Sequence, residues 1–209
     1  MIEMGNTKVI CTAIVEDSTA RHLTGTGQGW VTCEYAMLPG STGTRKKRDR
    51  GKTDGRSVEI QRLVGRALRS VVDMTKLGER TIWIDCDVIQ ADGGTRTASI
   101  TGAFVAMAQA MKKLKDSGMI EEIPLKGLVA AVSVGITEEG ELLDLCYEED
   151  SSAIADMNVV MTDKGEYIEI QGTGEARPFS PAELSKLLSL AAKGCGELHK
   201  KQKEIIGEL

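Results

Sequence analysis

The chain has 209 residues, of which 41% are hydrophobic and 27% are charged, and its formal net charge is −5 at pH 7. These proportions are typical of a globular protein and exclude a wholly disordered chain or a collagen-like fibre. No apolar run approaches the roughly 18 residues that a membrane helix needs, and the N-terminus lacks the basic and then apolar pattern of a signal peptide. We therefore expect one soluble, cytoplasmic domain over residues 1–209, with no membrane partner.

The first elements of the chain are predicted by their hydrophobic patterns. β-branched residues predict a strand from Thr7 to Val15, and a second strand is expected from Gln28 to Met37. The two strands are expected to pair as a hairpin. The segment Pro39 to Gly55 has almost no apolar residues and is expected to be a long exposed loop, a kind of loop that is often functional. Apolar residues at helical spacing then predict a helix from Arg56 to Met74.

The middle of the chain alternates between strand and helix patterns. The segment Thr81 to Gln90 is rich in strand-forming residues, and residues 91–96 are expected to form a turn. An Ala- and Met-rich run predicts a helix from Thr97 to Leu114. The nearly continuous apolar run from Leu128 to Ile136 predicts a strand that is buried on both faces.

The last third of the chain is predicted to contain three short strands and a long helix. Ser180, Pro181 and Glu183 form the pattern of a capped helix start, and this helix is expected to run past Gly194 to Ile206. The whole order, β-β-α-β-α-β-β-β-β-α without an internal repeat, predicts a single α+β domain. The three strands are expected at Glu141–Leu145, Asn158–Met161 and Tyr167–Gln171, with a turn at residues 163–165 between the last two.

The chain offers few histidine or cysteine residues that could act in catalysis. Histidine occurs twice, and the five cysteines are far apart and contain no CxxC pair. Reduced, mostly buried thiols are therefore expected rather than a zinc site or a set of disulfides. Any chemistry must depend on carboxylates, arginines, backbone groups or a metal.

A glycine-rich turn is the first candidate site. Gly93 and Gly94 allow close approach of a ligand to the backbone, and the N–H groups at the start of the following helix suit an anion. Thr95 adds a hydroxyl group, and the guanidinium of Arg96 matches the spacing of phosphate oxygens. The same residues also suit an ordinary turn between a strand and a helix, so this pattern alone leaves both interpretations open.

An acidic stretch from Asp144 to Asp156 is the second candidate. Asp150 and Asp156 are six positions apart, which places them on different faces of a helix but on one face of an extended segment. If the stretch is a loop, both carboxylates can point at one site, where they would hold Mg²⁺ or act as general acid or base. A solvated acidic loop is the alternative.

A basic cluster interrupts the long loop of this acidic protein. It comprises Arg45, Lys46, Lys47, Arg48, Arg50 and Lys52. Clustered cations of this kind suit the phosphates of a polyanion such as RNA, and a solvated flexible loop is the alternative.

Five stretches together resemble the bacterial ribonuclease PH family over nearly the whole chain, and the block DCDVIQADGGTRTASITGA is the most specific of them. They are Gly5–Asp17, Gly27–Pro39, Gly55–Asp73, Leu77–Met107 and Tyr147–Thr162. The resemblance implies a phosphorolytic 3′→5′ exoribonuclease that trims the 3′ ends of tRNA precursors. It also implies the ribosomal protein S5 domain-2-like fold and a homohexameric ring built as a trimer of dimers. A non-catalytic RNA-binding ring subunit is the alternative within this fold.

The resemblance also implies roles for particular residues. Phosphate, the co-substrate, would be bound by Arg56, Gly94, Thr95 and Arg96. Asp150 and Asp156 would be the catalytic residues and would hold Mg²⁺. RNA would be bound by the loop residues Arg45, Lys46, Lys47 and Arg48.

Three departures from the family pattern affect assembly and RNA binding more than phosphate binding. The family begins with a further segment that carries an Asp-Gly-Arg motif and a first strand, so Thr7 to Val15 is expected to be an unprotected sheet edge. Gly40 follows Pro39 where the family usually has an arginine, in a loop that looks shortened. Ala20 and Arg21 stand where the family often has two prolines.

Overall fold

The computed structural model describes residues 1–48 and 54–207. These residues form two four-stranded sheets and five α-helices, with a 3₁₀ turn η1 (Arg21–Leu23). The strands are β1 (Ile2–Met4), β2 (Thr7–Glu16), β3 (Trp30–Met37), β4 (Thr81–Gln90), β5 (Val129–Thr137), β6 (Gly140–Leu143), β7 (Ala155–Thr162) and β8 (Tyr167–Thr173). The helices are α1 (Gly55–Ser70), α2 (Met74–Leu77), α3 (Thr95–Asp116), α4 (Tyr147–Ser152) and α5 (Pro181–Ile206).

The first sheet has the order β1-β2-β4-β3, and this order contradicts the hairpin expected between the first two predicted strands. β4 lies between them, antiparallel to β2 and parallel to β3. The connection from residue 17 to residue 29 is longer than the roughly two to five residues of a hairpin loop, so it does not force β2 and β3 to be neighbours. β4 occupies the centre because Ile82, Ile84 and Val88 are fully buried on one of its faces.

The prediction that the strand from Thr7 to Val15 is an unprotected edge is wrong for its first residues. β1 pairs with Thr7, Lys8 and Val9 through a tight turn at Gly5. Within the described residues, the rest of β2 has β4 as its only strand partner.

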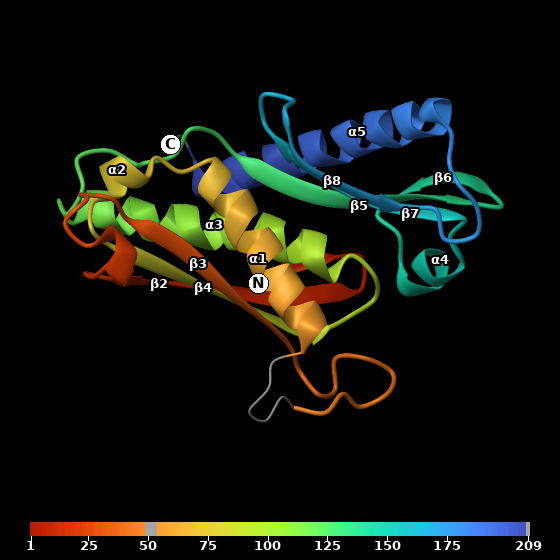
Figure 1. The fold of residues 1–209 in the computed structure, drawn as a ribbon, viewed down its shortest axis with the longest axis horizontal. Helices are drawn as coiled ribbons and strands as arrows, with labels where there is room; N and C mark the ends of the chain where they lie inside the picture. The colour runs from red at the N-terminus through yellow and green to blue at the C-terminus, as the bar shows by residue number, and fades with distance from the viewer. Residues whose placement is uncertain (49–53, 208–209) are drawn as a thin grey trace.

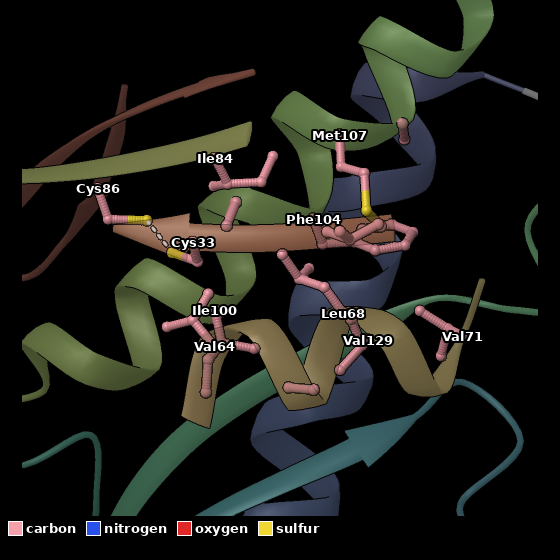
Figure 2. Close-up of a cluster of buried hydrophobic side chains, with 14 of the residues drawn as sticks. Cys33, Val64, Leu68, Val71, Ile84, Cys86, Ile100, Phe104, Met107 and Val129 are labelled. Atoms are coloured by element: carbon pink, nitrogen blue, oxygen red, sulfur yellow. Dashed lines mark hydrogen bonds between the residues drawn. The ribbon is translucent and has the colours of Figure 1, made fainter. Parts of the chain in front are cut away.

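The elements stack in four layers, as Figure 1 shows. Helices α1 and α3 lie between the first sheet and the second, whose order is β6-β5-β7-β8, and α5 covers the other face of the second sheet. The core between the two sheets is almost entirely aliphatic, with Phe104 of α3 fully buried near its centre (Figure 2). A second cluster joins the outer face of β5 and β7 to Leu187, Ala191 and Cys195 of α5.

We propose that residues 1–209 form one domain, as the sequence predicts. The same core takes Ile84 and Cys86 from the first sheet, Leu68 from α1 and Val129 from the second sheet (Figure 2). A core shared by both halves of the chain leaves neither half with a hydrophobic centre of its own between the sheets.

Most predicted elements are confirmed, but β1 was not expected, β7 begins at Ala155 rather than Asn158, and several other bounds differ. The first helix ends at Ser70, and α2 is a separate turn whose N-cap is the side chain of Asp73. The second helix begins at Thr95, two residues earlier than expected. The expected acidic loop contains α4. The capped start at Ser180 and the helix to Ile206 are confirmed. No helix in the described ranges is both long and apolar enough to cross a bilayer.

Candidate active site

A cavity of about 910 Å³ is lined by the first residues of α1 and α3 together with residues of α4 and the second sheet. Its lining draws on both halves of the chain and combines cations with carboxylates. All six residues expected to bind phosphate or to catalyse line this cavity: Arg56, Gly94, Thr95, Arg96, Asp150 and Asp156.

The glycine-rich turn delivers the N-terminus of α3 to the cavity. Gly94 is the N-cap and has a positive φ of 55°, so α3 begins at Thr95. The first N–H groups of a helix carry partial positive charge and have no partner within the helix. The first turn of α3 therefore presents donors of the kind that suit an anion.

A second helix begins at the same cavity. Arg56 is the second residue of α1 and lines the cavity together with Arg96, and the charges of both arginines act on Tyr35. Arg96 itself is held by hydrogen bonds to Glu59 and Gln171, and its side chain is 17% exposed. Two guanidinium groups and two helix N-termini therefore meet at this cavity.

Tyr35 contacts Thr95 at the start of α3. Its hydroxyl group lies 2.9 Å from the hydroxyl of Thr95, and its side chain is buried. Burial raises the pKa of Tyr35, whereas the bond to Thr95 and the nearby charges of Arg56 and Arg96 act in the opposite direction. Tyr35 therefore stays neutral and fixes the orientation of the Thr95 hydroxyl.

The two aspartates reach the cavity from different elements. Asp150 lies on α4 and Asp156 on β7, so a short helix and a strand, rather than the loop that the sequence suggested, bring them together. Burial, and next the charges of Asp150 and Glu175, raise the pKa of Asp156, while Arg96 lowers it. These influences indicate that the acidic and basic groups act on one another across the cavity.

Hydrogen bonds join the glycine-rich turn to the start of α4, the helix that carries Asp150. Asp92 accepts hydrogen bonds from the Tyr147 backbone N–H at the start of α4 and from the Asn6 side chain. Thr7 donates to the Gly93 carbonyl at 2.6 Å and accepts from the Asp92 N–H at 2.9 Å. The first turn of the chain thus holds the segment that carries the candidate anion site.

The described basic residues differ in their position relative to the cavity. Lys46 lines it, and its Nζ lies 3.5 Å from the Met37 sulfur. Arg45, Lys47 and Arg48 are exposed and do not line it. The remaining cations of the predicted cluster, at positions 50 and 52, lie outside the described residues.

Sequence reasoning missed several residues around the cavity. Ser133 and Asn158 line it, and they face each other on neighbouring strands β5 and β7. Asn158 lies two positions after Asp156 and therefore on the same face of β7. A polar residue at this spacing in an otherwise apolar strand was the available signal. Glu59, Gln171 and Tyr35 gave no such signal, because their partners are far away in the sequence.

Gly93→Ala is expected to lower the melting temperature by at least about 5 °C. Gly93 has a φ of +75°, and a Cβ there would lie 2.2 Å from the Leu145 carbonyl oxygen. A side chain at positive φ costs about 1–3 kcal/mol, and the backbone contact adds to this cost. Each kcal/mol corresponds to roughly 2–4 °C for a chain of this size.

Gly165→Ala is the matched control for this measurement by thermal denaturation. Its φ is +80°, but no atom lies within 4 Å of the added Cβ. It therefore carries only the cost of the backbone conformation. Equal losses in the two variants would show that the approach of Gly93 to Leu145 is unimportant.

Comparison with known proteins agrees with this arrangement along the whole chain. A model described as "3' exoribonuclease family, domain 1" matches residues 1–113, and the "domain 2" model of the same family matches residues 127–194. Ribonuclease PH of Bacillus velezensis is 61% identical over 211 aligned residues, which cover all of this chain and 86% of that protein. Ribonuclease PH of Bacillus pumilus is 60% identical, with 100% and 88% covered.

Solved structures share the fold at much lower sequence identity. An Archaeoglobus fulgidus exosome with RNA bound to the active site matches with a TM-score of 0.77 and 20% identity, over 95% of this chain and 80% of that one. Rice (Oryza sativa) Rrp46 matches with a TM-score of 0.75 and 16% identity, over 98% and 86%. Since the family models and the Bacillus relatives extend over both sheets and the cavity between them, the chain belongs to the ribonuclease PH family of 3′ exoribonucleases.

Proposed function

We propose that this cavity performs phosphorolysis at the 3′ end of RNA, and trims the 3′ ends of tRNA precursors. Inorganic phosphate attacks the last phosphodiester, the bond from phosphorus to the 3′ oxygen of the preceding nucleotide breaks, and a nucleoside diphosphate leaves. The observation that supports this best is the meeting of Arg56, Arg96 and the α3 N-terminus with Asp150 and Asp156 in one cavity.

The positive side of the cavity would hold the attacking phosphate. Arg56, Arg96 and the hydroxyl of Thr95 supply charged and neutral donors, and the backbone N–H groups at the start of α3 supply more. Phosphoryl transfer depends mainly on alignment of the reactants and on neutralisation of charge. Donors held on the ends of two helices provide both.

The acidic side would act on the leaving 3′ oxygen. Of the two aspartates, Asp156 is the better proton donor, because burial and the charges of Asp150 and Glu175 raise its pKa. The proton would pass to the 3′ oxygen as its bond to phosphorus breaks. The pKa of Asp156 is raised first by burial and then by its proximity to Asp150, which is exposed on α4.

Binding of Mg²⁺ by the same two carboxylates is the alternative to proton donation, because a carboxylate that binds the ion is ionised and has no proton to give. In the described parts of the chain, no three or more His, Cys, Asp or Glu side chains lie close enough together to hold a metal ion by themselves. Mg²⁺ needs no such cluster, since it commonly binds one or two carboxylates and takes its other ligands from substrate phosphates and water. Asp150 and Asp156 would hold it. When bound, the ion would neutralise negative charge at the scissile phosphodiester.

The basic loop residues would guide the RNA chain to the cavity. Lys46 lies at the cavity itself, and Arg45, Lys47 and Arg48 are exposed beside it in the sequence. Cations of this kind contact phosphates without regard to sequence, so binding should weaken as salt increases. A cytoplasmic location is part of this proposal.

The activity is tested by incubation of the protein with a tRNA-like RNA that carries a 3′ extension. With Mg²⁺ and inorganic phosphate, the extension should shorten and nucleoside diphosphates should accumulate, whereas omission of phosphate should stop the reaction. Shortening without phosphate would contradict phosphorolysis. RNA binding without any shortening would favour a non-catalytic RNA-binding subunit.

We also propose assembly into a hexameric ring, a trimer of dimers. Six copies of 22.5 kDa give a mass of about 135 kDa. Size-exclusion chromatography with light scattering at micromolar concentration should return this mass. A monomer that nevertheless degrades RNA would remove the ring from the account and leave the cavity chemistry intact.

A further inference from the structure

We propose that Gln171 and Glu59 are positioning residues that orient the guanidinium of Arg96 toward phosphate. This inference rests on the proposed function, because it assigns to Arg96 the binding of the attacking phosphate. It concerns two side chains that do not line the cavity and that come from α1 and β8.

The three side chains form a closed ring of hydrogen bonds. Nη1 of Arg96 donates to Oε1 of Gln171 at 2.7 Å and to Oε1 of Glu59 at 3.2 Å. Nε2 of Gln171 donates to the same Glu59 oxygen at 3.2 Å. The amide thus presents its oxygen to the cation and its nitrogen to the carboxylate, which is the arrangement that both charges favour.

This ring leaves the correct part of the guanidinium available. In the described part of the chain, the hydrogen bonds of Arg96 all involve Nη1, and Nη2 and Nε have no protein partner. A guanidinium presents its donors in a fixed planar fork. The hydrogen bonds at Nη1 restrict the orientation of this plane, and they therefore determine where Nη2 and Nε point. These two groups together are suited to bind two oxygens of one phosphate.

The two elements that carry Glu59 and Gln171 are also joined at a point away from Arg96. A second bridge joins the same two elements: Arg66 donates from Nε to Glu169 at 2.9 Å. Arg66 lies seven residues after Glu59 on α1, and Glu169 lies two residues before Gln171 on β8, so each pair shares one face of its element. Helix α1 and strand β8 are thus joined at two levels.

Glu59 could have a different role, and the two roles predict opposite results. A carboxylate 3.2 Å from Nη1 could compete with phosphate for the guanidinium. The ring argues for positioning, because Gln171 and Glu59 bind the same corner of Arg96 and bind each other. If this corner is released, the long arginine side chain samples more rotamers and phosphate binds less tightly.

The direct test is isothermal titration with inorganic phosphate. Gln171→Met keeps the length and the neutral charge of the side chain but removes the amide, and it should weaken phosphate binding about three- to tenfold. The melting temperature and the KM for RNA should stay at wild-type values. Glu169→Gln is the matched control: it weakens the Arg66 bridge on the same strand, away from Arg96, and should leave phosphate affinity unchanged. Unchanged affinity in Gln171→Met would overturn the proposal.

Two further variants separate positioning from other effects. In an Arg96→Ala background, Gln171→Met should have no additional effect on phosphate affinity, because its action passes through Arg96. A full additional loss there would overturn the proposal. Glu59→Ala should also weaken phosphate binding, and tighter binding would mean that Glu59 competes with phosphate.

These outcomes are distinct from failure of the proposed function. If the wild-type protein binds no phosphate and releases no nucleoside diphosphate, the cavity assignment itself is wrong. If the wild-type protein does both and Gln171→Met does both equally well, only the positioning role is wrong.

Discussion

Asp156→Asn is expected to abolish phosphorolysis while RNA still binds. The substitution keeps the size and shape of the side chain on β7 but removes the group that would hold Mg²⁺ or donate the proton. Loss of a positioned acid or base typically lowers kcat by about 10²–10⁴-fold. Initial rates of nucleoside diphosphate release at saturating RNA and phosphate measure kcat, and a filter-binding assay measures RNA affinity.

The stability of this variant provides an internal control. Because burial raises the pKa of Asp156, the folded protein holds the proton more tightly than the unfolded chain does. The protonated side chain is compatible with folding at low pH, and its ionisation opposes folding as the pH rises through the folded-state pKa. Asp156→Asn should therefore melt at or above the wild-type temperature at neutral pH, and their difference should shrink in acid.

Glu148→Gln serves as the matched control for the loss of activity. Glu148 is exposed on α4, two residues before Asp150, and does not line the cavity. Its substitution should leave kcat within about twofold of the wild-type value. If Asp156→Asn retains wild-type turnover, the acidic side of the cavity is solvated surface and takes no part in the chemistry.

Arg96→Ala should lower the phosphate-dependent rate at least about tenfold. A hydrogen bond to a charged group contributes about 1.5–3 kcal/mol. At about 1.4 kcal/mol per tenfold change, the loss of one such contact corresponds to roughly 10- to 100-fold. The change should appear as a higher KM for phosphate, with the KM for RNA nearly unchanged, in initial rates measured against phosphate concentration.

Two comparison variants make this result specific. Arg96→Lys keeps the positive charge but lacks the planar fork, so its rate should fall between those of the wild type and Arg96→Ala. Arg62→Ala removes an exposed arginine of α1 that does not line the cavity, and its rate should remain at the wild-type value. Wild-type kinetics in Arg96→Ala would remove Arg96 from the site.

The sequence predicted elements that are determined locally. The start of α5 follows from Ser180 and Glu183, which bond to each other's backbone N–H groups within one turn. The order of the first sheet is a different matter. β4 lies between β2 and β3 because it pairs with both of them. This pairing depends on contacts between distant segments, and no pattern within β2 or β3 predicts it.

The candidate site shows the same limit. The glycine turn is local, so Gly94, Thr95 and Arg96 could be identified from a contiguous motif. Asp150 and Asp156 were expected on a loop, because their spacing excludes a shared helix face; in fact one lies on α4 and the other on β7. Gln171 meets Arg96 across 75 positions of sequence, and only the tertiary fold brings β8 to the first turn of α3.

Transfer of labelled phosphate tests the central claim most directly. Purified protein is incubated with RNA, Mg²⁺ and ³²P-labelled inorganic phosphate, and the released nucleotides are separated. If the anion held by Arg56, Arg96 and the α3 N-terminus is the attacking group, the label appears in the β position of nucleoside diphosphates. Unlabelled nucleoside monophosphates would instead mean that water is the attacking group, and would contradict the account.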